Sequence, residues 1–182
     1  MFQGVKNIRI VELGLSQLYL NADKLSNISK WFKQHDLSDF EPLPVHNFGN
    51  GRLTLTDGHS RAFIAYMAGL EEIPVIYDTD EMVTSKIGQL FYKNDIIWCD
   101  RFNLRNICDL ECRIVSNEDY KKLWIARCDR SHNLLTQTNE LERHNLSLLH
   151  SNLFLYGASE DLKILYFENS KGDCFEYKNP LS

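Results

Sequence analysis

The segment LTDGHSRAFIAY, residues 55–66, joins a short apolar run to a helical pattern within four residues. Asp57-Gly58 is a dipeptide typical of turns, and Ala62 and Ala65 follow at the spacing of one helix face. A turn that leads directly into a helix exposes backbone N–H groups, which attract anions. The same residues also fit a plain turn before a capped helix. The segment therefore poses a choice between a phosphate site and ordinary turn chemistry.

The side chains of this turn suit a phosphate site. Gly58 lets the backbone approach a ligand closely, and Ser60 can either cap the helix or donate to a phosphate oxygen. Arg61 adds a fixed positive charge, and His59 can donate, accept or transfer a proton near neutral pH. Asp57 repels phosphate, so we expect it to hold Mg²⁺ or to accept a proton from an attacking hydroxyl group.

The segments around the turn predict a small α+β unit in residues 1–80. In order, we expect a strand at 8–13, a helix at 24–35 capped by Asn21 or Asp23, hairpin strands at 43–48 and 52–57 around Gly49-Asn50-Gly51, a helix at 60–70 that ends at Gly69, and a strand at 71–78. Strands and helices thus alternate in this part of the chain.

The sequence after residue 80 has a different character. Residues 81–135 are mainly helical in pattern, and residues 152–178 predict a strand, a turn and a hairpin around Lys171-Gly172. We therefore predict an α+β fold with two parts. Residues 1–80 form one domain, and residues 81–182 form a mixed, mainly helical extension that ends in a β-hairpin.

The composition bears on whether the protein binds nucleic acid or metal and on where in the cell it lies. The 182 residues include 20 Lys and Arg against 25 Asp and Glu, for a formal net charge of -5, which argues against nucleic acid as a partner. No apolar run reaches the roughly 18–20 residues of a membrane span, and the N-terminus lacks the pattern of a signal peptide. We expect a cytoplasmic protein that does not enter a membrane. Cys108 and Cys112 lack a second pair of ligands, so no metal site is expected there.

The span PLPVHNFGNGRLTLTDGHSRAFIAYMAGLEEIPVIYD, residues 42–78, resembles the ParB/sulfiredoxin-like superfamily. In that group an apolar strand leads into a DG-H-x-R-like turn, and an alanine-rich helix, a Gly-Leu stop and an x-I-P-V strand follow. The segment IRIVELGLSQLYLNADKLSNISKWF, residues 8–32, is similar to the first motif of the group. The resemblance covers roughly residues 8–80, and residues 81–182 match no family that we recognise.

Three branches of the superfamily imply different functions. Sulfiredoxins carry a reactive cysteine in the turn, where this chain has His59. ParB partition proteins bind CTP and follow the turn with a DNA-reading helix-turn-helix, but residues 81–102 are not basic and show no such motif. Free serine kinases phosphorylate serine with ADP or ATP, and their D-G-H-x-R turn matches residues 57–61 position by position.

The kinase resemblance assigns roles to the turn. It implies that Gly58, His59, Ser60 and Arg61 hold the phosphates of ADP or ATP, and that Asp57 is catalytic or orients Mg²⁺. These kinases also carry an essential Glu directly before a Gln-Leu pair, where this chain has Ser16. An unactivated serine cannot replace a carboxylate base. Glu12, four residues earlier, then joins Asp57 and His59 as a catalytic candidate.

Two readings from different classes therefore remain open. The first is a nucleotide-dependent kinase that transfers phosphate to a small hydroxyl compound. The second is a non-catalytic module that binds nucleotide or only a protein, and whose C-terminal half contacts a protein partner or a second copy of the chain. Ser16 favours the second reading and the intact Asp57 favours the first.

Overall fold

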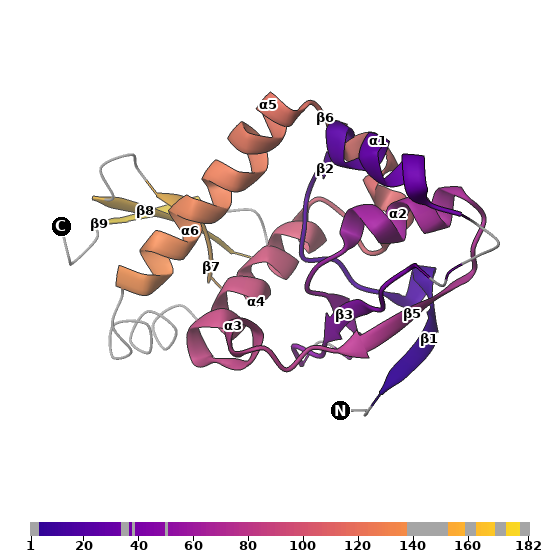
Figure 1. Cartoon of the computed structure of the whole chain (residues 1–182). Coiled ribbons are helices and arrows are strands. Elements are labelled where there is room, and N and C mark those ends of the chain that lie inside the picture. The colour runs from indigo at the N-terminus through magenta and orange to yellow at the C-terminus, as the bar shows by residue number, and fades with distance from the viewer. Residues whose placement is uncertain are drawn as a thin grey trace. The chain divides into compact units, whose positions relative to one another are not determined.

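The computed structural model describes residues 4–33, 37, 39–49, 51–137, 153–158, 163–169 and 174–178 (Figure 1). Helices and strands alternate along it, which confirms a mixed α+β fold. The chain forms two compact units, Met1–Trp124 and Ile125–Ser182. A boundary at residue 80 is expected from the sequence, whereas the first compact unit continues through the helices that follow, up to Trp124.

A four-stranded sheet in the order β1-β5-β3-β4 forms the centre of the first unit. Its strands are β1 (Val5–Arg9), β3 (Leu43–His46), β4 (Thr54–Leu55) and β5 (Glu72–Tyr77). β5 pairs antiparallel with β1 and parallel with β3, and β3 and β4 form the expected hairpin. The parallel pair needs a crossover, which the helix after the turn supplies. Leu43, Val45, Leu55 and Val75 are fully buried in the core.

The helices of the first 80 residues lie close to where the sequence predicts them. They are the 3-10 helix η1 (Ile10–Glu12), α1 (Ala22–Trp31) and α2 (His59–Met67). The strand expected at residues 8–13 is shorter, because it ends at Arg9 and the chain turns into η1. Gly69 adopts a positive φ of 83° just after α2, as expected for a residue that ends a helix.

Asn21 both caps α1 and ties it to a distant segment. Its side-chain oxygen accepts hydrogen bonds from the N–H groups of Asp23 (2.9 Å) and Lys24 (3.2 Å). Its Nδ2 donates to Asn117 Oδ1 at 2.8 Å. Beside this bond the short strands β2 (Leu20–Asn21) and β6 (Ile114–Val115) pair in parallel. These contacts explain why residues beyond 80 belong to the first compact unit.

Residues 81–137 are mainly helical, as expected. They contain α3 (Glu81–Thr84), α4 (Lys86–Arg101), the 3-10 helix η2 (Ile107–Arg113), α5 (Asn117–Tyr120), the π-helix η3 (Lys121–Ile125) and α6 (Ala126–Gln137). Ser85 separates α3 from α4 and caps α4, because its side chain accepts a hydrogen bond from the Gly88 N–H at 3.2 Å. Among the described residues, none of the helices is both long and apolar enough to cross a membrane.

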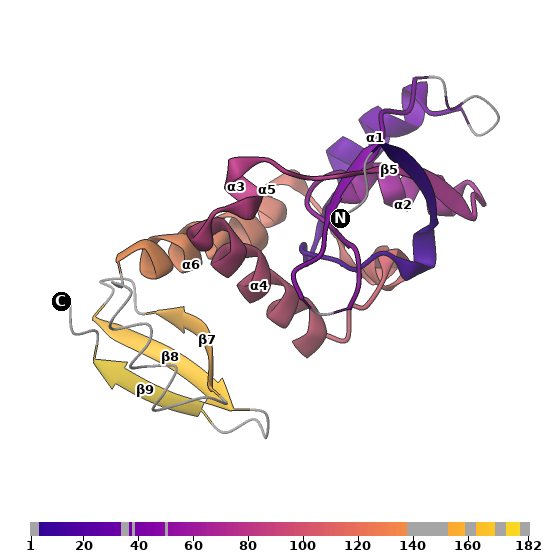
Figure 2. The same ribbon diagram turned by 90° about the horizontal axis from the view of Figure 1, so that it is seen from below.

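The second unit contains an antiparallel sheet in the order β7-β8-β9, drawn as three adjacent arrows in Figure 2. Its strands are β7 (Leu153–Ala158), β8 (Ile164–Asn169) and β9 (Cys174–Lys178). β8 and β9 form the expected C-terminal hairpin, and β7 adds a third strand to it. The expected turn at Lys171-Gly172 lies outside the described residues.

The two roles of Asn21 make its replacement costly. Asn21→Ala removes the cap of α1 and the bond to Asn117, so it should lower the free energy of unfolding by about 1–2 kcal/mol, as measured by urea denaturation. Asn27→Ala is the matched control, because Asn27 only accepts an exposed bond from Lys30 and its loss should cost less than about 0.5 kcal/mol. Equal losses in both variants would contradict the assigned role of Asn21.

Candidate functional site

The turn before α2 depends on the backbone of Gly58. This residue is buried, has φ 81° and ψ 14°, and forms the N-cap of α2. An added Cβ would lie 2.7 Å from Leu43 Cδ2, so both the left-handed backbone and the close packing require glycine. α2 therefore begins at His59 with Gly58 as its N-cap, so of the two roles considered for Ser60 the helix cap is excluded.

The start of α2 leaves backbone donors without a side-chain cap. The first helical bond runs from the Ala62 N–H to the Gly58 carbonyl at 2.9 Å, and within the described chain no side chain caps this end. The N–H groups of His59, Ser60 and Arg61 precede that bond. Such groups carry the positive end of the helix dipole and suit an anion. The geometry expected of a phosphate site is thus present, although it is also that of any uncapped helix.

The His59 ring is buried and held in the neutral form by a hydrogen bond that it accepts. Its side chain is only 3% exposed, and its Nε2 accepts a hydrogen bond from the Ser16 N–H at 3.1 Å. The ring proton therefore lies on Nδ1. Burial lowers the pKa of His59 from 6.5 to about 4, and the nearby Asp57 carboxylate only partly opposes this effect. At neutral pH the imidazole is uncharged, which suits donation rather than proton transfer.

Ser16 has a structural role at the position where the resemblance implies a Glu. It is 5% exposed, and its hydroxyl group donates to the Leu55 carbonyl at 2.7 Å. With the bond to His59, Ser16 ties the loop after η1 to the end of β4 and to the first residue of α2. Its N–H and hydroxyl groups are both used within the protein, so the side chain does not provide a base.

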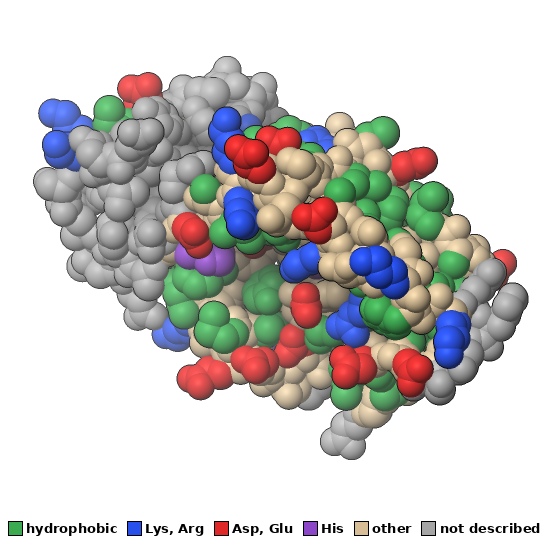
Figure 3. All heavy atoms as spheres, turned by 45° about the horizontal axis from the view of Figure 1, so that its top comes forward, with side chains coloured by type: hydrophobic (Ala, Val, Ile, Leu, Met, Phe, Trp, Pro, Cys, Tyr) green, Lys and Arg blue, Asp and Glu red, His purple; other side chains and the backbone are tan. Residues whose placement is uncertain are grey.

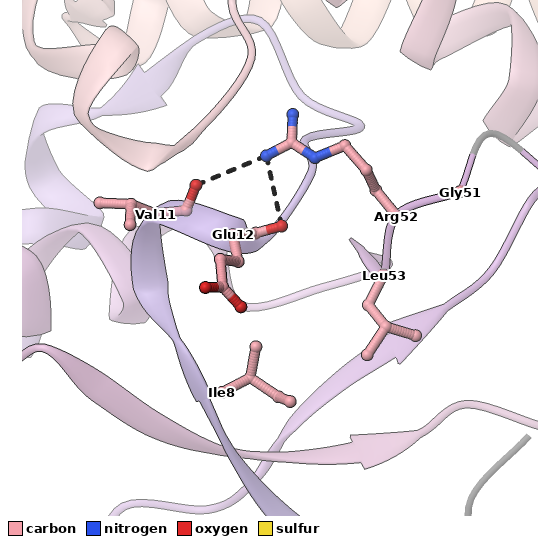
Figure 4. Close-up of a pocket in the computed structure, with 6 residues that line it drawn as sticks. All are labelled: Ile8, Val11, Glu12, Gly51, Arg52 and Leu53. Atoms are coloured by element: carbon pink, nitrogen blue, oxygen red, sulfur yellow. Dashed lines mark hydrogen bonds between the residues drawn. The ribbon is translucent and has the colours of Figure 1, made fainter.

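The structure places Glu12 in the wall of a separate hollow of about 430 Å³, drawn in Figure 4. The other described residues that line it are Ile8, Val11, Gly51, Arg52 and Leu53. The Arg52 guanidinium group donates to the carbonyl oxygens of Val11 and Glu12, and the Glu12 carboxylate points away from it. That carboxylate instead pairs with Arg9 at 3.3 Å in an exposed ion pair. Glu12 and the residues of the turn do not line a common described cavity.

Arg61 lines a second hollow, of about 440 Å³, together with Trp31, Asp39 and Glu41. Its guanidinium group lies 3.5 Å from the Glu41 carboxylate, and Glu41 has a side chain that is 86% exposed. The Arg61 side chain is only 20% exposed, but the Glu41 carboxylate is largely in water, so the pair contributes about 1 kcal/mol and an incoming phosphate group can displace the carboxylate. Trp31 is 44% exposed and adds a flat apolar wall to the hollow. The sequence pattern gave no sign of this cavity.

Three polar residues beside the turn were not anticipated from the sequence. The Thr56 hydroxyl donates to Asp78 Oδ2 at 2.5 Å, and the Tyr92 hydroxyl donates to the Thr56 carbonyl at 3.3 Å. Asp78 directly follows β5, which pairs in parallel with β3, and ligands commonly bind at the carboxyl ends of parallel strands, so its position was a usable signal. Tyr92 lies in the middle of α4, and nothing local marks it.

The donor set supports a weakly ligated Mg²⁺ at most. Among the described residues, no group of three His, Cys, Asp or Glu side chains could hold a metal ion. Mg²⁺ in nucleotide sites commonly binds one or two carboxylates together with the phosphates, and the exposed Asp57 carboxylate fits that requirement. Cys108, one of the two cysteines considered as ligands, has its thiol against Asn106 Oδ1 instead.

Comparisons with known proteins add little to this site. No protein-family model and no curated protein matches the chain. A solved structure that resembles it is that of protein Atu1540 from Agrobacterium tumefaciens, with a TM-score of 0.35 and 16% sequence identity. The match covers 59% of this chain and 61% of that one, less than two thirds of its length. A likeness this weak carries no conclusion on fold or function.

The lowered pKa of His59 predicts a loss of stability in acid. As the pH falls, the unfolded chain protonates His59 near 6.5, whereas the folded protein does so only at about 4. The free energy of unfolding should therefore fall between these two values, by about 3 kcal/mol. In His59→Gln, the free energy of unfolding measured by urea denaturation should change less with pH across this range than in the wild type. In the folded wild type, NMR should detect no titration of this ring between pH 5 and 8, and a titration near 6.5 would contradict its burial.

Proposed function

We propose that this protein binds a nucleoside di- or triphosphate whose phosphates lie at the N-terminus of α2. The observation that carries the proposal is the start of this helix. The N-cap Gly58 has a left-handed backbone, no described side chain caps the helix, and the buried His59 at its first position is held in the neutral form by the hydrogen bond that it accepts from the Ser16 N–H. Neutral donors and uncapped N–H groups bind phosphate without the cost of a second buried charge.

The hollow beside Arg61 supports the same proposal. Its volume of about 440 Å³ falls in the range of small-molecule sites, and Arg61 connects it to the turn. The exposed indole of Trp31 offers a surface on which a base can stack. The Asp39 and Glu41 carboxylates can accept hydrogen bonds from ribose hydroxyl or base amino groups. A nucleotide would then reach from the helix start into this hollow.

We further propose that the first unit belongs to the ParB/sulfiredoxin-like superfamily and transfers phosphate from ADP or ATP to a small hydroxyl compound, as free serine kinases do. Asp57 would orient Mg²⁺ or accept the proton of the attacking hydroxyl. Such a reaction depends on positioning and on neutralisation of phosphate charge. Asp57 is exposed directly before Gly58, so its carboxylate is accessible to ligands.

Two observations favour a second candidate, a nucleotide-binding module without transfer. Ser16 is committed to structural hydrogen bonds, and Glu12 lines a different hollow. The transferase therefore needs another carboxylate to assist Asp57. Glu41, which pairs with Arg61, and Asp78, which anchors the residue before Asp57, are the described acids closest to that role.

The surface charge bears on the class of partner. On the face drawn in Figure 3, basic and acidic side chains are interspersed rather than gathered into a continuous basic area. With the net charge of -5, this supports small ligands over nucleic acid. A protein partner or a second copy at the C-terminal half, and a cytoplasmic location, also remain proposals.

Thermal unfolding with nucleotides tests the binding proposal. A ligand that binds only the folded state raises the melting temperature, so ADP, ATP or CTP with Mg²⁺ should each be tried at about 100 times the dissociation constant, where the gain is about 2.7 kcal/mol. The shift should disappear in Arg61→Ala and persist in Glu41→Gln, which keeps Arg61 but removes its competing carboxylate. No shift with any nucleotide in the wild type would overturn the proposal.

Replacement of Asp57 separates the two candidates. Because Asp57 is exposed, Asp57→Asn should leave the melting temperature within about 2 °C of the wild type and retain the nucleotide-induced shift. If the protein is a kinase, transfer of phosphate to serine should fall by at least about a hundredfold, as measured by product formation. Equal turnover in the mutant would exclude the assigned role of Asp57. Absence of turnover in the wild type, with binding intact, would favour the non-catalytic module.

A further inference from the structure

The residue before Asp57 is anchored through every polar group that it has. The Thr56 N–H donates to the Pro44 carbonyl at 3.1 Å, and the Thr56 hydroxyl donates to Asp78. Its carbonyl accepts a hydrogen bond from the Tyr92 hydroxyl at 3.3 Å. The partners in the first two bonds belong to the central sheet: Pro44 lies in β3, and Asp78 directly follows β5. The third comes from α4, in the part of the chain that lies beyond the resemblance to any family.

Tyr92 is itself well placed to act as a fixed donor. Its ring stacks on Phe48, with the centroids 5.0 Å apart and the planes inclined by 22°. One turn earlier on the same helix, the Gln89 side-chain amide donates to His46 Nε2 at 3.1 Å and to the Val83 carbonyl at 2.9 Å. These contacts attach α4 to the hairpin that precedes the turn.

The charges around Tyr92 keep it in the donor form. Burial raises the pKa of Tyr92 to about 12, and the carboxylates of Asp78 and Asp57 add to the effect, followed by those of Asp95 and Asp80. The phenol therefore stays protonated at any pH at which the protein is used. The hydrogen bond to the Thr56 carbonyl places this hydroxyl group against the residue that directly precedes Asp57.

We infer that Tyr92 is a positioning residue: its hydrogen bond to the Thr56 carbonyl fixes the backbone from which Asp57 projects. Tyr92 has no direct role in chemistry. Its effect on catalysis therefore rests on the proposed function, in which Asp57 is the catalytic group. The segment after residue 80 then contributes to the site by holding the turn in its active geometry. A displacement of a catalytic group by about 1 Å can lower the rate about a hundredfold, so loss of the Tyr92 hydrogen bond should change the rate of phosphate transfer measurably.

Tyr92→Phe tests the inference, because it keeps the ring stacked on Phe48 and removes only the hydroxyl group. We expect the NMR order parameters of the Asp57 and Gly58 amides to fall from about 0.85, typical of a rigid backbone, towards 0.6. We also expect kcat for phosphate transfer to fall about tenfold while KM for the nucleotide changes less than twofold, since the N–H groups of His59, Ser60 and Arg61 belong to α2 and keep their helical geometry.

Tyr77→Phe is the matched control, because it removes the hydroxyl group of another tyrosine of the same unit, one that accepts a hydrogen bond from the Asn47 N–H in the hairpin loop. This control should leave the order parameters at Asp57 and kcat unchanged. Unchanged order parameters in Tyr92→Phe, or equal effects of both variants, would overturn the inference. If the wild type neither binds nor transfers phosphate, the proposed function fails, and the order parameters alone still decide whether Tyr92 fixes the turn.

Discussion

The hydrogen bond from the Ser16 N–H group to His59 Nε2 is the interaction on which the candidate site depends. It is buried and joins two segments that are 43 residues apart in the chain. The Ser16 hydroxyl reinforces it by binding the Leu55 carbonyl, and Gly14 exchanges backbone hydrogen bonds with Leu53 and Leu55. The loop after η1 thus pairs with β4 and fixes the first residue of α2. Without this bond, the ring of His59 would be a buried polar group with an unsatisfied acceptor.

This constraint also determines the electrostatics of the turn. A protonated imidazole could not accept from Ser16, and its burial would be costly, so His59 is neutral at physiological pH. The positive potential at the turn must then come from the dipole of α2 and from Arg61. Arg61 is partly neutralised by Glu41, which is exposed and free to rotate away. The Glu41 carboxylate therefore competes with an incoming phosphate group for Arg61, and the Asp57 carboxylate beside the turn further lowers the positive potential there unless a cation such as Mg²⁺ neutralises it.

Features specified by local sequence were predictable. Four features rest on residues within a few positions of one another: the cap by Asn21, the hairpin of β3 and β4, the helix after Gly58, and the strand that follows it. Features that depend on contacts between distant segments could not be predicted from the sequence. Three features arise only when the sheet is assembled: the change from β1 to η1, the structural hydrogen bonds of Ser16, and the contact between Tyr92 on α4 and Thr56. Whether Asp57, Gly58, His59, Ser60 and Arg61 bind phosphate stays a prediction.

The most direct measurement of the central claim is an NMR titration of the ¹⁵N-labelled protein with Mg²⁺ and ADP, then with ATP and CTP. Phosphate bound at the helix start would accept hydrogen bonds from the backbone N–H groups of His59, Ser60 and Arg61. The account predicts that these three amides show the largest changes in chemical shift and that the changes saturate. Saturable changes confined to other residues, or no change with any of the three nucleotides, would contradict it and leave the turn as an uncapped helix start.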